Sequence, residues 1–131
     1  MIAKYLLDTN ALLRYLRNDI PKQSAQVTEI VAKAKQRQAI VTIPVVVFME
    51  LVFALWKFYG ETKEAIGNQL FTLASNPVLD VEKREIVRQA FLLWKEKNVS
   101  FVDCFLAIEA SIEGKTLFTF DEKLKRLASA V

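Results

Sequence analysis

The chain has 131 residues and a formal net charge of +3; 53% of its residues are hydrophobic, 25% are charged and none is histidine. This composition excludes a disordered chain and predicts a single folded domain, residues 1–131, with a sizeable apolar core. Without histidine, and with three widely scattered glycines, the chain lacks a Ser-His-Asp triad, a histidine-ligated zinc site, a P-loop and a dinucleotide-binding loop.

The predicted elements alternate between short strands and helices. The first is a buried strand over residues 2–7, which leads into a helix capped by Thr9 or Asn10. The following segments, in chain order, are a helix over 21–35, a strand over 39–43, helices over 44–58 and 61–74, a strand over 78–79, helices over 82–97 and 101–112, a strand over 116–120 and a helix over 122–128. This alternation predicts an α/β sandwich with a mostly parallel sheet.

The segment 39–58 has nearly the length of a membrane span and contains few charged residues. Pro44 interrupts it, however, and Glu50 lies near its middle, where a charge is costly in a bilayer. We therefore expect a strand followed by a buried helix, and no membrane contact. The N-terminal residues show no signal-peptide pattern and the single cysteine, Cys104, excludes an internal disulfide, so we expect a cytoplasmic protein.

Four carboxylates lie in apolar stretches, whereas most of the 15 acidic residues have polar or charged neighbours. Asp8 ends a predicted strand, Glu50 and Asp103 lie within apolar runs, and Asp121 follows the predicted strand 116–120. In apolar surroundings a carboxylate must be neutralised, paired or bound to a cation, because an isolated buried charge is costly. Asp8 and Asp121 also lie at the carboxyl ends of predicted parallel strands, where α/β sheets form ligand crevices.

Three of these acids also have a structural interpretation. Asp8 and Asp121 are suited to capping, and Asp103 would cap its helix if that helix began late, or would pair with a distant Arg or Lys. Glu50 lies in the middle of its helix, cannot cap it, and has no charged partner three or four residues away. The four acids together are harder to explain by structure alone than any one of them.

The motifs that contain these acids resemble, in their order, the PIN-domain nucleases and in particular the VapC-like toxins of toxin–antitoxin pairs. They are Tyr5-Leu6-Leu7-Asp8-Thr9-Asn10 followed by Leu12-Leu13-Arg14, Pro44-Val45 leading to Glu50, the run 101–107 around Asp103, and the run 118–123 around Asp121. The resemblance covers nearly the whole chain. Val102 and Cys104 stand where the family more often has alanine, and we interpret both as packing substitutions.

The resemblance implies a three-layer α/β/α sandwich with a central parallel sheet of four or five strands. It implies that the four acids converge at the carboxyl edge of this sheet, with Asn10 and Thr119 facing the substrate or supporting the site. It also implies an RNA substrate, a cognate antitoxin that holds the protein inactive, and a homodimer.

Oxygen ligands without nitrogen or thiolate favour Mg²⁺ or Mn²⁺ over zinc, and four carboxylates balance about two divalent ions. The predicted activity is a metal-dependent endoribonuclease that hydrolyses phosphodiester bonds. Asp8, Asp103 and Asp121 would be metal ligands, and Glu50 either a ligand or the group that orients water.

Two groups of side chains are open to more than one interpretation. Basic residues would contact RNA or form solvated helix faces; they are Arg14, Arg17, Lys33, Lys35, Arg37, Lys123, Lys125 and Arg126. Aromatic residues would belong to the core, to a dimer contact or to a groove for an antitoxin helix; they are Phe48, Phe53, Trp56, Phe58, Tyr59 and Phe71.

Three rival interpretations are weaker. A haloacid-dehalogenase-type phosphatase needs a second Asp two residues after the first, where this chain has Asn10. A receiver domain needs an early adjacent acidic pair and a lysine after the last strand, and neither pattern is clear. A catalytically inactive PIN-like scaffold for protein binding is disfavoured because all four acids are present.

Overall fold

The computed structural model of the chain describes residues 2–131. The chain divides into two units, and each is described by itself. Unit 1 comprises Met1–Tyr59 and Asn76–Glu82, and unit 2 comprises Gly60–Ser75 and Lys83–Val131.

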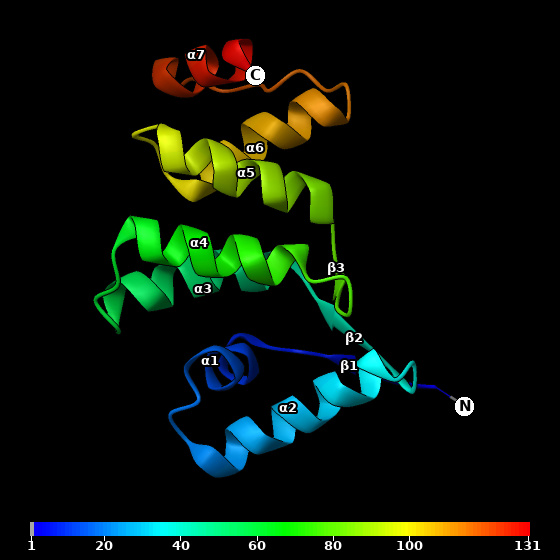
Figure 1. The fold of residues 1–131 in the computed structure, drawn as a ribbon. Coiled ribbons are helices and arrows are strands. Elements are labelled where there is room, and N and C mark those ends of the chain that lie inside the picture. Colours follow the sequence, from blue (N-terminus) through cyan, green and yellow to red (C-terminus); the bar gives the residue numbers. More distant parts are fainter. Residues whose placement is uncertain (1) are drawn as a thin grey trace. The chain divides into compact units, whose positions relative to one another are not determined.

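Unit 1 is built on a parallel three-stranded sheet with the order β1-β2-β3 (Figure 1). Its strands are β1 (Ala3–Leu6), β2 (Ala39–Ile43) and β3 (Asp80–Val81), and its helices are α1 (Thr9–Arg17), α2 (Pro21–Lys35) and α3 (Val45–Lys57). β2 is the central strand, and its Val41 and Ile43 side chains are fully buried. Because β1 and β2 are parallel, α1 and α3 both begin at the carboxyl edge of the sheet.

The start of α3 depends on a side chain from later in the chain. Pro44 is the N-cap of α3 and makes no side-chain hydrogen bond to the helix. The Val45 amide instead donates a hydrogen bond to the Glu82 carboxylate over 2.8 Å. Glu82 thereby satisfies one of the free amides that every helix has at its N-terminus, and its negative charge suits that position.

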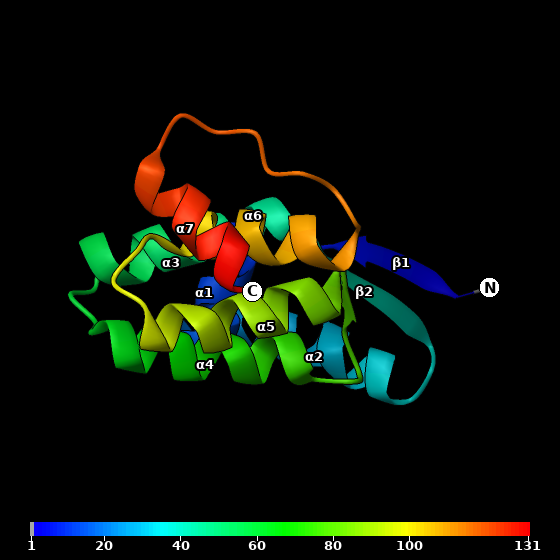
Figure 2. The same cartoon turned by 90° about the horizontal axis from the view of Figure 1, so that it is seen from above.

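Unit 2 is helical and contains α4 (Lys63–Ser75), α5 (Arg84–Glu96), α6 (Phe101–Ile112) and α7 (Glu122–Ala130). Successive helices pack on one another, α4 on α5, α5 on α6 and α6 on α7 (Figures 1 and 2). Phe91 is buried and stacks on Phe101 with 4.1 Å between ring centroids, and Trp94 packs edge-on against both rings. This aromatic cluster joins α5 to the first turn of α6, where Asp103 lies.

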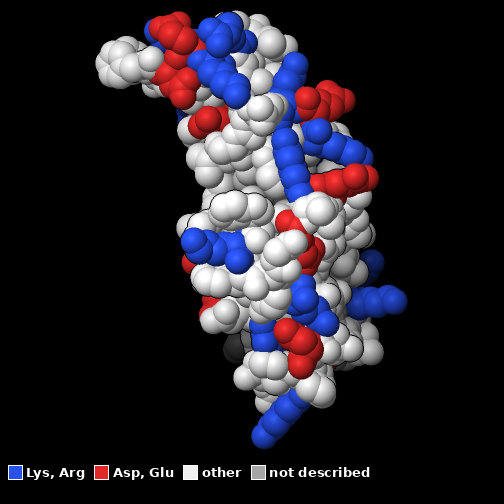
Figure 3. All heavy atoms as spheres, turned by 90° about the vertical axis from the view of Figure 1, so that its left-hand side faces the viewer, with Lys and Arg blue, Asp and Glu red and all other residues white. Residues whose placement is uncertain are grey.

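Charged side chains of both signs are mixed on the surface. On the face drawn in Figure 3, Lys and Arg side chains alternate with Asp and Glu and form no continuous basic stripe. The basic runs identified in the sequence have such acidic neighbours, because Lys33 Nζ lies 4.0 Å from Glu29 and Lys125 Nζ 3.2 Å from Glu122. Part of their charge is therefore balanced locally, as on a solvated helix face.

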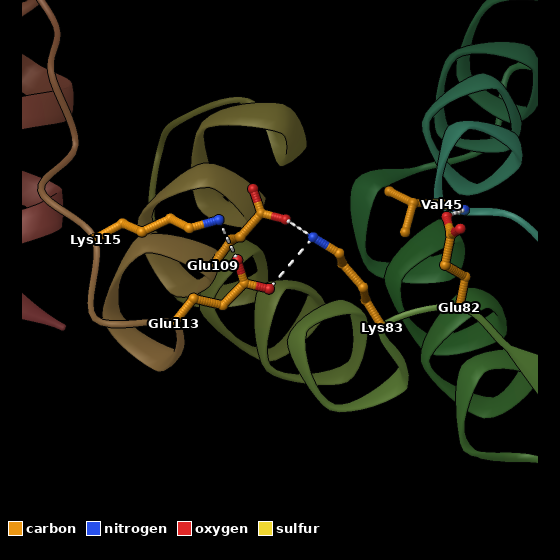
Figure 4. A network of polar contacts seen from close by, with 6 residues as sticks. All are labelled: Val45, Glu82, Lys83, Glu109, Glu113 and Lys115. Carbon is orange, nitrogen blue, oxygen red and sulfur yellow. Dashed lines mark hydrogen bonds and ion pairs between the residues drawn. The ribbon is translucent and has the colours of Figure 1, made fainter.

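A network of ion pairs joins the start of α5 to the end of α6 (Figure 4). Lys83 donates a hydrogen bond to Glu109 over 2.6 Å and lies 3.3 Å from Glu113, to which Lys115 donates over 2.8 Å. Hydrogen bonds to Glu109 and Glu113 raise the pKa of Lys83, and hydrogen bonds from Lys115 and Lys83 lower the pKa of Glu113. Both shifts favour the charged forms, so the network stays ionised at neutral pH.

The predicted strand over 116–120 is wrong. These residues have no regular structure, and Phe118 and Phe120 are 82% and 86% exposed. A strand forms only when its backbone groups pair with a neighbour, and the β propensity of Thr and Phe does not by itself supply that neighbour. Over residues 2–131 the sheet therefore has three strands instead of the predicted four or five.

The third strand lies two residues later than predicted. The Val78 amide donates to Asn76 Oδ1 over 3.0 Å, which extends the turn at Asn76-Pro77 through the predicted strand 78–79. Asp80 then pairs with Thr42 of β2, whose hydroxyl donates to Asp80 Oδ2 over 2.7 Å. This local turn chemistry moves the strand to Asp80–Val81.

Other predictions are confirmed. The parallel sheet with its helices fits an α/β sandwich, and the bounds predicted for 21–35, 39–43 and 101–112 are those of α2, β2 and α6. Segment 39–58 forms β2 and α3 as predicted. Within residues 2–131, every helix is too short or too polar to cross a membrane.

Candidate functional site

Asp8 and Glu50 are connected at the N-terminus of α1 in unit 1. Asp8 is the N-cap of α1, not Thr9 or Asn10 as predicted, and its Oδ1 atom accepts a hydrogen bond from the Ala11 amide over 2.8 Å. Thr9, the first residue of α1, donates its hydroxyl hydrogen to Glu50 Oε1 over 2.9 Å. The start of α1 thus positions Asp8 directly and Glu50 through Thr9.

Both acids line one pocket of about 690 Å³. The lining residues combine acidic and polar groups with apolar and aromatic ones, and they are Asp8, Thr9, Asn10, Leu13, Met49, Glu50, Phe53, Ala54, Phe58 and Tyr59. All of them belong to unit 1. Oxygen atoms from two carboxylates, a hydroxyl and an amide are hard ligands, so this donor set fits Mg²⁺ or Mn²⁺.

The burial suggested by the apolar neighbours of the acids is wrong for most of them. Asp8, Glu50 and Asp121 are exposed, and Asp103 is half-buried. In α3 the reason is helical periodicity: Phe48 and Leu51 point into the core with 0% exposure, whereas Glu50 lies on another face because successive helical residues are turned by about 100°. The carboxylates are therefore accessible to an ion or a substrate.

Asp103 lies in the first turn of α6 in unit 2. The N-cap of this helix is Ser100, whose hydroxyl accepts a hydrogen bond from the Asp103 amide over 3.1 Å. The interpretation of Asp103 as the cap of a late-starting helix is therefore wrong, because Ser100 already fills that position. The Asp103 carboxylate is therefore not needed to cap α6.

Asp121 is the N-cap of α7, as its structural interpretation predicts. Its Oδ1 atom accepts hydrogen bonds from the amides of Lys123 and Leu124 over 2.9 and 3.1 Å. Thr119 supports this turn, since its hydroxyl oxygen accepts a hydrogen bond from the Asp121 amide over 3.1 Å. Figures 1 and 2 show the N-terminal turns of α6 and α7 at the same end of unit 2, so Asp103 and Asp121 belong to that end.

Arg14 is held inside unit 1. Its side chain is 12% exposed, its Nη1 atom lies 3.3 Å from Asp19 and its Nη2 atom donates to the Tyr59 hydroxyl over 2.9 Å. The Arg17 guanidinium lies 3.9 Å from the centroid of the Tyr59 ring. The two arginines thereby fix Tyr59 at the pocket, while contact of Arg14 with phosphate stays a prediction.

The two pairs of acids belong to different units. Asp8 and Glu50 are in unit 1, and Asp103 and Asp121 are in unit 2. Over residues 2–131, neither unit by itself gathers three or more Asp, Glu, His or Cys side chains as a metal site.

The family profile of the PIN domain matches residues 5–130, which is nearly the whole chain. The chain belongs to the PIN-domain family. It is similar to the VapC ribonuclease of Aquifex aeolicus strain VF5, with 27% identity over 123 residues that cover 93% of this chain and 90% of that protein. The resemblance to VapC-like PIN domains that the sequence motifs indicate is thereby confirmed.

In this PIN domain, Thr9 is a pocket residue whose contact with Glu50 the sequence does not predict. Its place before the helix suits a cap, whereas the structure makes it a hydrogen-bond donor to Glu50, 41 positions later. No local pattern reveals a contact over that separation. The one available signal was its position next to Asp8, inside the first PIN-domain motif.

Cys104 is a packing residue of the PIN domain rather than a reactive one. It is fully buried in α6, and burial raises the pKa of its thiol to about 11. A thiol with this pKa is protonated at neutral pH, and only the thiolate is a strong nucleophile. The Cys104 thiol is therefore a weak nucleophile at neutral pH.

Proposed function

We propose that the protein is a Mg²⁺- or Mn²⁺-dependent endoribonuclease, the toxin of a toxin–antitoxin pair. The observation that carries the proposal is that Asp8 and Glu50 line one pocket and are connected through Thr9. Membership of the PIN-domain family and likeness to a protein named VapC ribonuclease support the choice of RNA as substrate.

The carboxylates of Asp8, Glu50, Asp103 and Asp121 would hold the divalent ions. The metal, when bound, supplies Lewis acidity that makes water a better nucleophile and stabilises charge on the phosphate. Thr9 occupies one oxygen of Glu50 and leaves the other free to bind the ion or to accept a proton from the attacking water. Asn10 faces the same pocket and would contact the substrate, and Thr119 would hold Asp121 in place.

The same proposal includes the organisation of the protein. Residues 1–131 would form a single three-layer PIN domain. The protein would act in the cytoplasm as a homodimer and be held inactive by its cognate antitoxin. Sedimentation of the purified chain as a clean monomer would contradict the dimer.

Metal removal tests the proposal directly. Purified full-length protein should cleave single-stranded RNA in Mg²⁺ or Mn²⁺, lose activity in excess EDTA and regain it when the ion is returned, because the chain has no histidine to act as general acid or base. Isothermal titration with Mn²⁺ gives a readout of the ion that does not depend on turnover. Cleavage at an undiminished rate in EDTA would refute metal dependence.

Substitution of Thr9 tests how Glu50 is positioned. Thr9→Val keeps the side-chain shape but removes a hydrogen bond to a charged group, so we expect kcat to fall by about ten-fold, corresponding to about 1.4 kcal/mol. Thr9→Ser is the matched control, since it keeps the hydroxyl group and should retain most of the activity. Equal kcat values for Thr9→Val and the wild type would show that Glu50 does not depend on this contact.

A further inference from the structure

Three exposed aromatic side chains gather at the end of α3 in unit 1. Phe53, Trp56 and Phe58 are 52%, 61% and 71% exposed, whereas Phe48 of the same helix is fully buried. The centroid of the Phe53 ring lies 6.4 Å from that of Trp56 and 6.1 Å from that of Phe58. In the predicted aromatic set, Phe48 is thus a core residue, whereas Phe53, Trp56 and Phe58 form a surface cluster. Contiguous exposed aromatic surface is typical of binding sites.

Part of this cluster lines the pocket of the two acids. Phe53 and Phe58 are lining residues together with Asp8 and Glu50, whereas Trp56, the neighbour of Phe53, is not. Tyr59, which Arg14 and Arg17 fix in place, adds a third ring. The pocket therefore combines ring surfaces with two carboxylates.

This combination suits one nucleotide better than an apolar ligand. Aromatic rings stack on the face of any nucleobase, and carboxylates hold the divalent ion that neutralises an adjoining phosphate. An apolar peptide or a lipid tail would offer nothing to balance the charges of Asp8 and Glu50, and covering them would be costly. Asn10 adds an amide that both donates and accepts hydrogen bonds, as contact with a base edge requires.

We propose that this pocket is a nucleobase subsite, in which Phe53 stacks on a base next to the scissile phosphate of single-stranded RNA. The proposal rests on the proposed nuclease function and deepens it by naming the group that binds substrate beside the acids. Tyr59 and Phe58 form further walls of the subsite. Because stacking does not depend on base identity, Phe53 contributes affinity for single strands rather than selection of one sequence.

Direct binding tests the subsite without turnover. The full chain is titrated, with Ca²⁺ in place of Mg²⁺, into fluorescein-labelled single-stranded RNA of mixed sequence, and anisotropy gives Kd. Phe53→Ala should raise Kd by about ten-fold, since stacking on one ring accounts for at least that much. Phe53→Trp should keep wild-type affinity. Trp56→Ala removes a more exposed ring that does not line the pocket and should change Kd little.

An abasic RNA separates stacking from other effects of the substitution. In an RNA short enough to bind in one register, replacing one base at a time by an abasic site should weaken wild-type binding most at a single position. That position should lose its effect in Phe53→Ala. Phe53 is half exposed, so the variant should fold, and circular dichroism checks this. The subsite would be overturned if Phe53→Ala left Kd unchanged, or if the effects of Phe53→Ala and of the abasic site were additive. The exposed rings would then be assigned to contact with a protein partner.

The outcomes for the subsite and for the proposed function are distinguishable. If the wild type binds RNA with the expected Phe53 dependence but never cleaves it, the nuclease proposal fails and the subsite stands. If the wild type cleaves RNA in Mg²⁺ and Phe53→Ala binds it equally well, the subsite fails and the nuclease stands. A wild type that binds no RNA in Ca²⁺ and cleaves none in Mg²⁺ overturns both.

Discussion

Asp8→Asn should lower the rate of metal-dependent RNA cleavage by about 10²–10³-fold, or about 3–4 kcal/mol of transition-state stabilisation. The substitution removes a negative charge from the proposed ion site but keeps a carbonyl oxygen at the same position. That oxygen can still accept the hydrogen bond from the Ala11 amide, and Asn is as good an N-cap as Asp. The melting temperature should therefore stay close to that of the wild type while activity is lost.

A control carboxylate makes this result specific. Glu29 lies on α2 of the same unit, is exposed and is not among the residues that line the pocket, so Glu29→Gln should leave both activity and stability nearly unchanged. An Asp8→Asn protein that is folded and cleaves RNA at the wild-type rate would contradict the site.

Asp103→Asn extends the test to unit 2. If both acids bind the same ions, the double variant Asp8→Asn/Asp103→Asn should lose little more activity than either single variant. The reason is that the effects of substituting residues that act together are not additive. If the rate reductions of the two single variants multiply in the double variant, Asp8 and Asp103 act independently. That result would contradict a shared role in binding the ions.

Phe91→Ala should reduce the free energy of unfolding by about 3–5 kcal/mol, the usual cost of deleting a buried phenyl ring. Phe91 is 1% exposed and stacks on Phe101 at 4.1 Å, with Trp94 edge-on at 6.3 Å, so the cavity would lie inside the aromatic core of unit 2. Urea unfolding followed by circular dichroism measures the change.

The adjacent residue provides the matched control. Leu92 lies on the same helix and is 51% exposed, and Leu92→Ala should change stability by much less. A loss below about 1.5 kcal/mol for Phe91→Ala would mean that the aromatic cluster collapses to fill the space, contrary to close packing of this core.

Helices and the central strand were predictable because their signals are local. Pro21 starts α2, the apolar stripe with Ile86, Val87 and Phe91 marks the buried face of α5, and the β-branched run 39–43 is β2. Residues 116–120 show the same kind of pattern and still form no strand. Strand formation depends on a partner elsewhere in the chain, which the segment's own residues do not encode.

Asp8 and Glu50, two of the acids singled out in the sequence, line one pocket, but their contacts could not be predicted. The acids could be singled out because each lies in an apolar run, although that same cue wrongly suggested burial for Glu50, which the helix turns outward. The Thr9–Glu50 hydrogen bond and the Arg17–Tyr59 contact join residues far apart in the chain. Only the folded backbone brings such partners together.

The path of the chain between the units has a consequence for synthesis. The chain leaves unit 1 after Tyr59 and returns to it at Asn76–Glu82. This second segment supplies β3 and the Glu82 carboxylate at the first turn of α3. A nascent chain that has emerged only as far as residue 75 therefore exposes an unpaired edge of β2 and an uncapped α3, the helix that bears Glu50. Residue 82 must emerge from the ribosome before β3 pairs with β2 and Glu82 caps α3, so we expect a product that ends before residue 82 to be poorly folded at the pocket of unit 1.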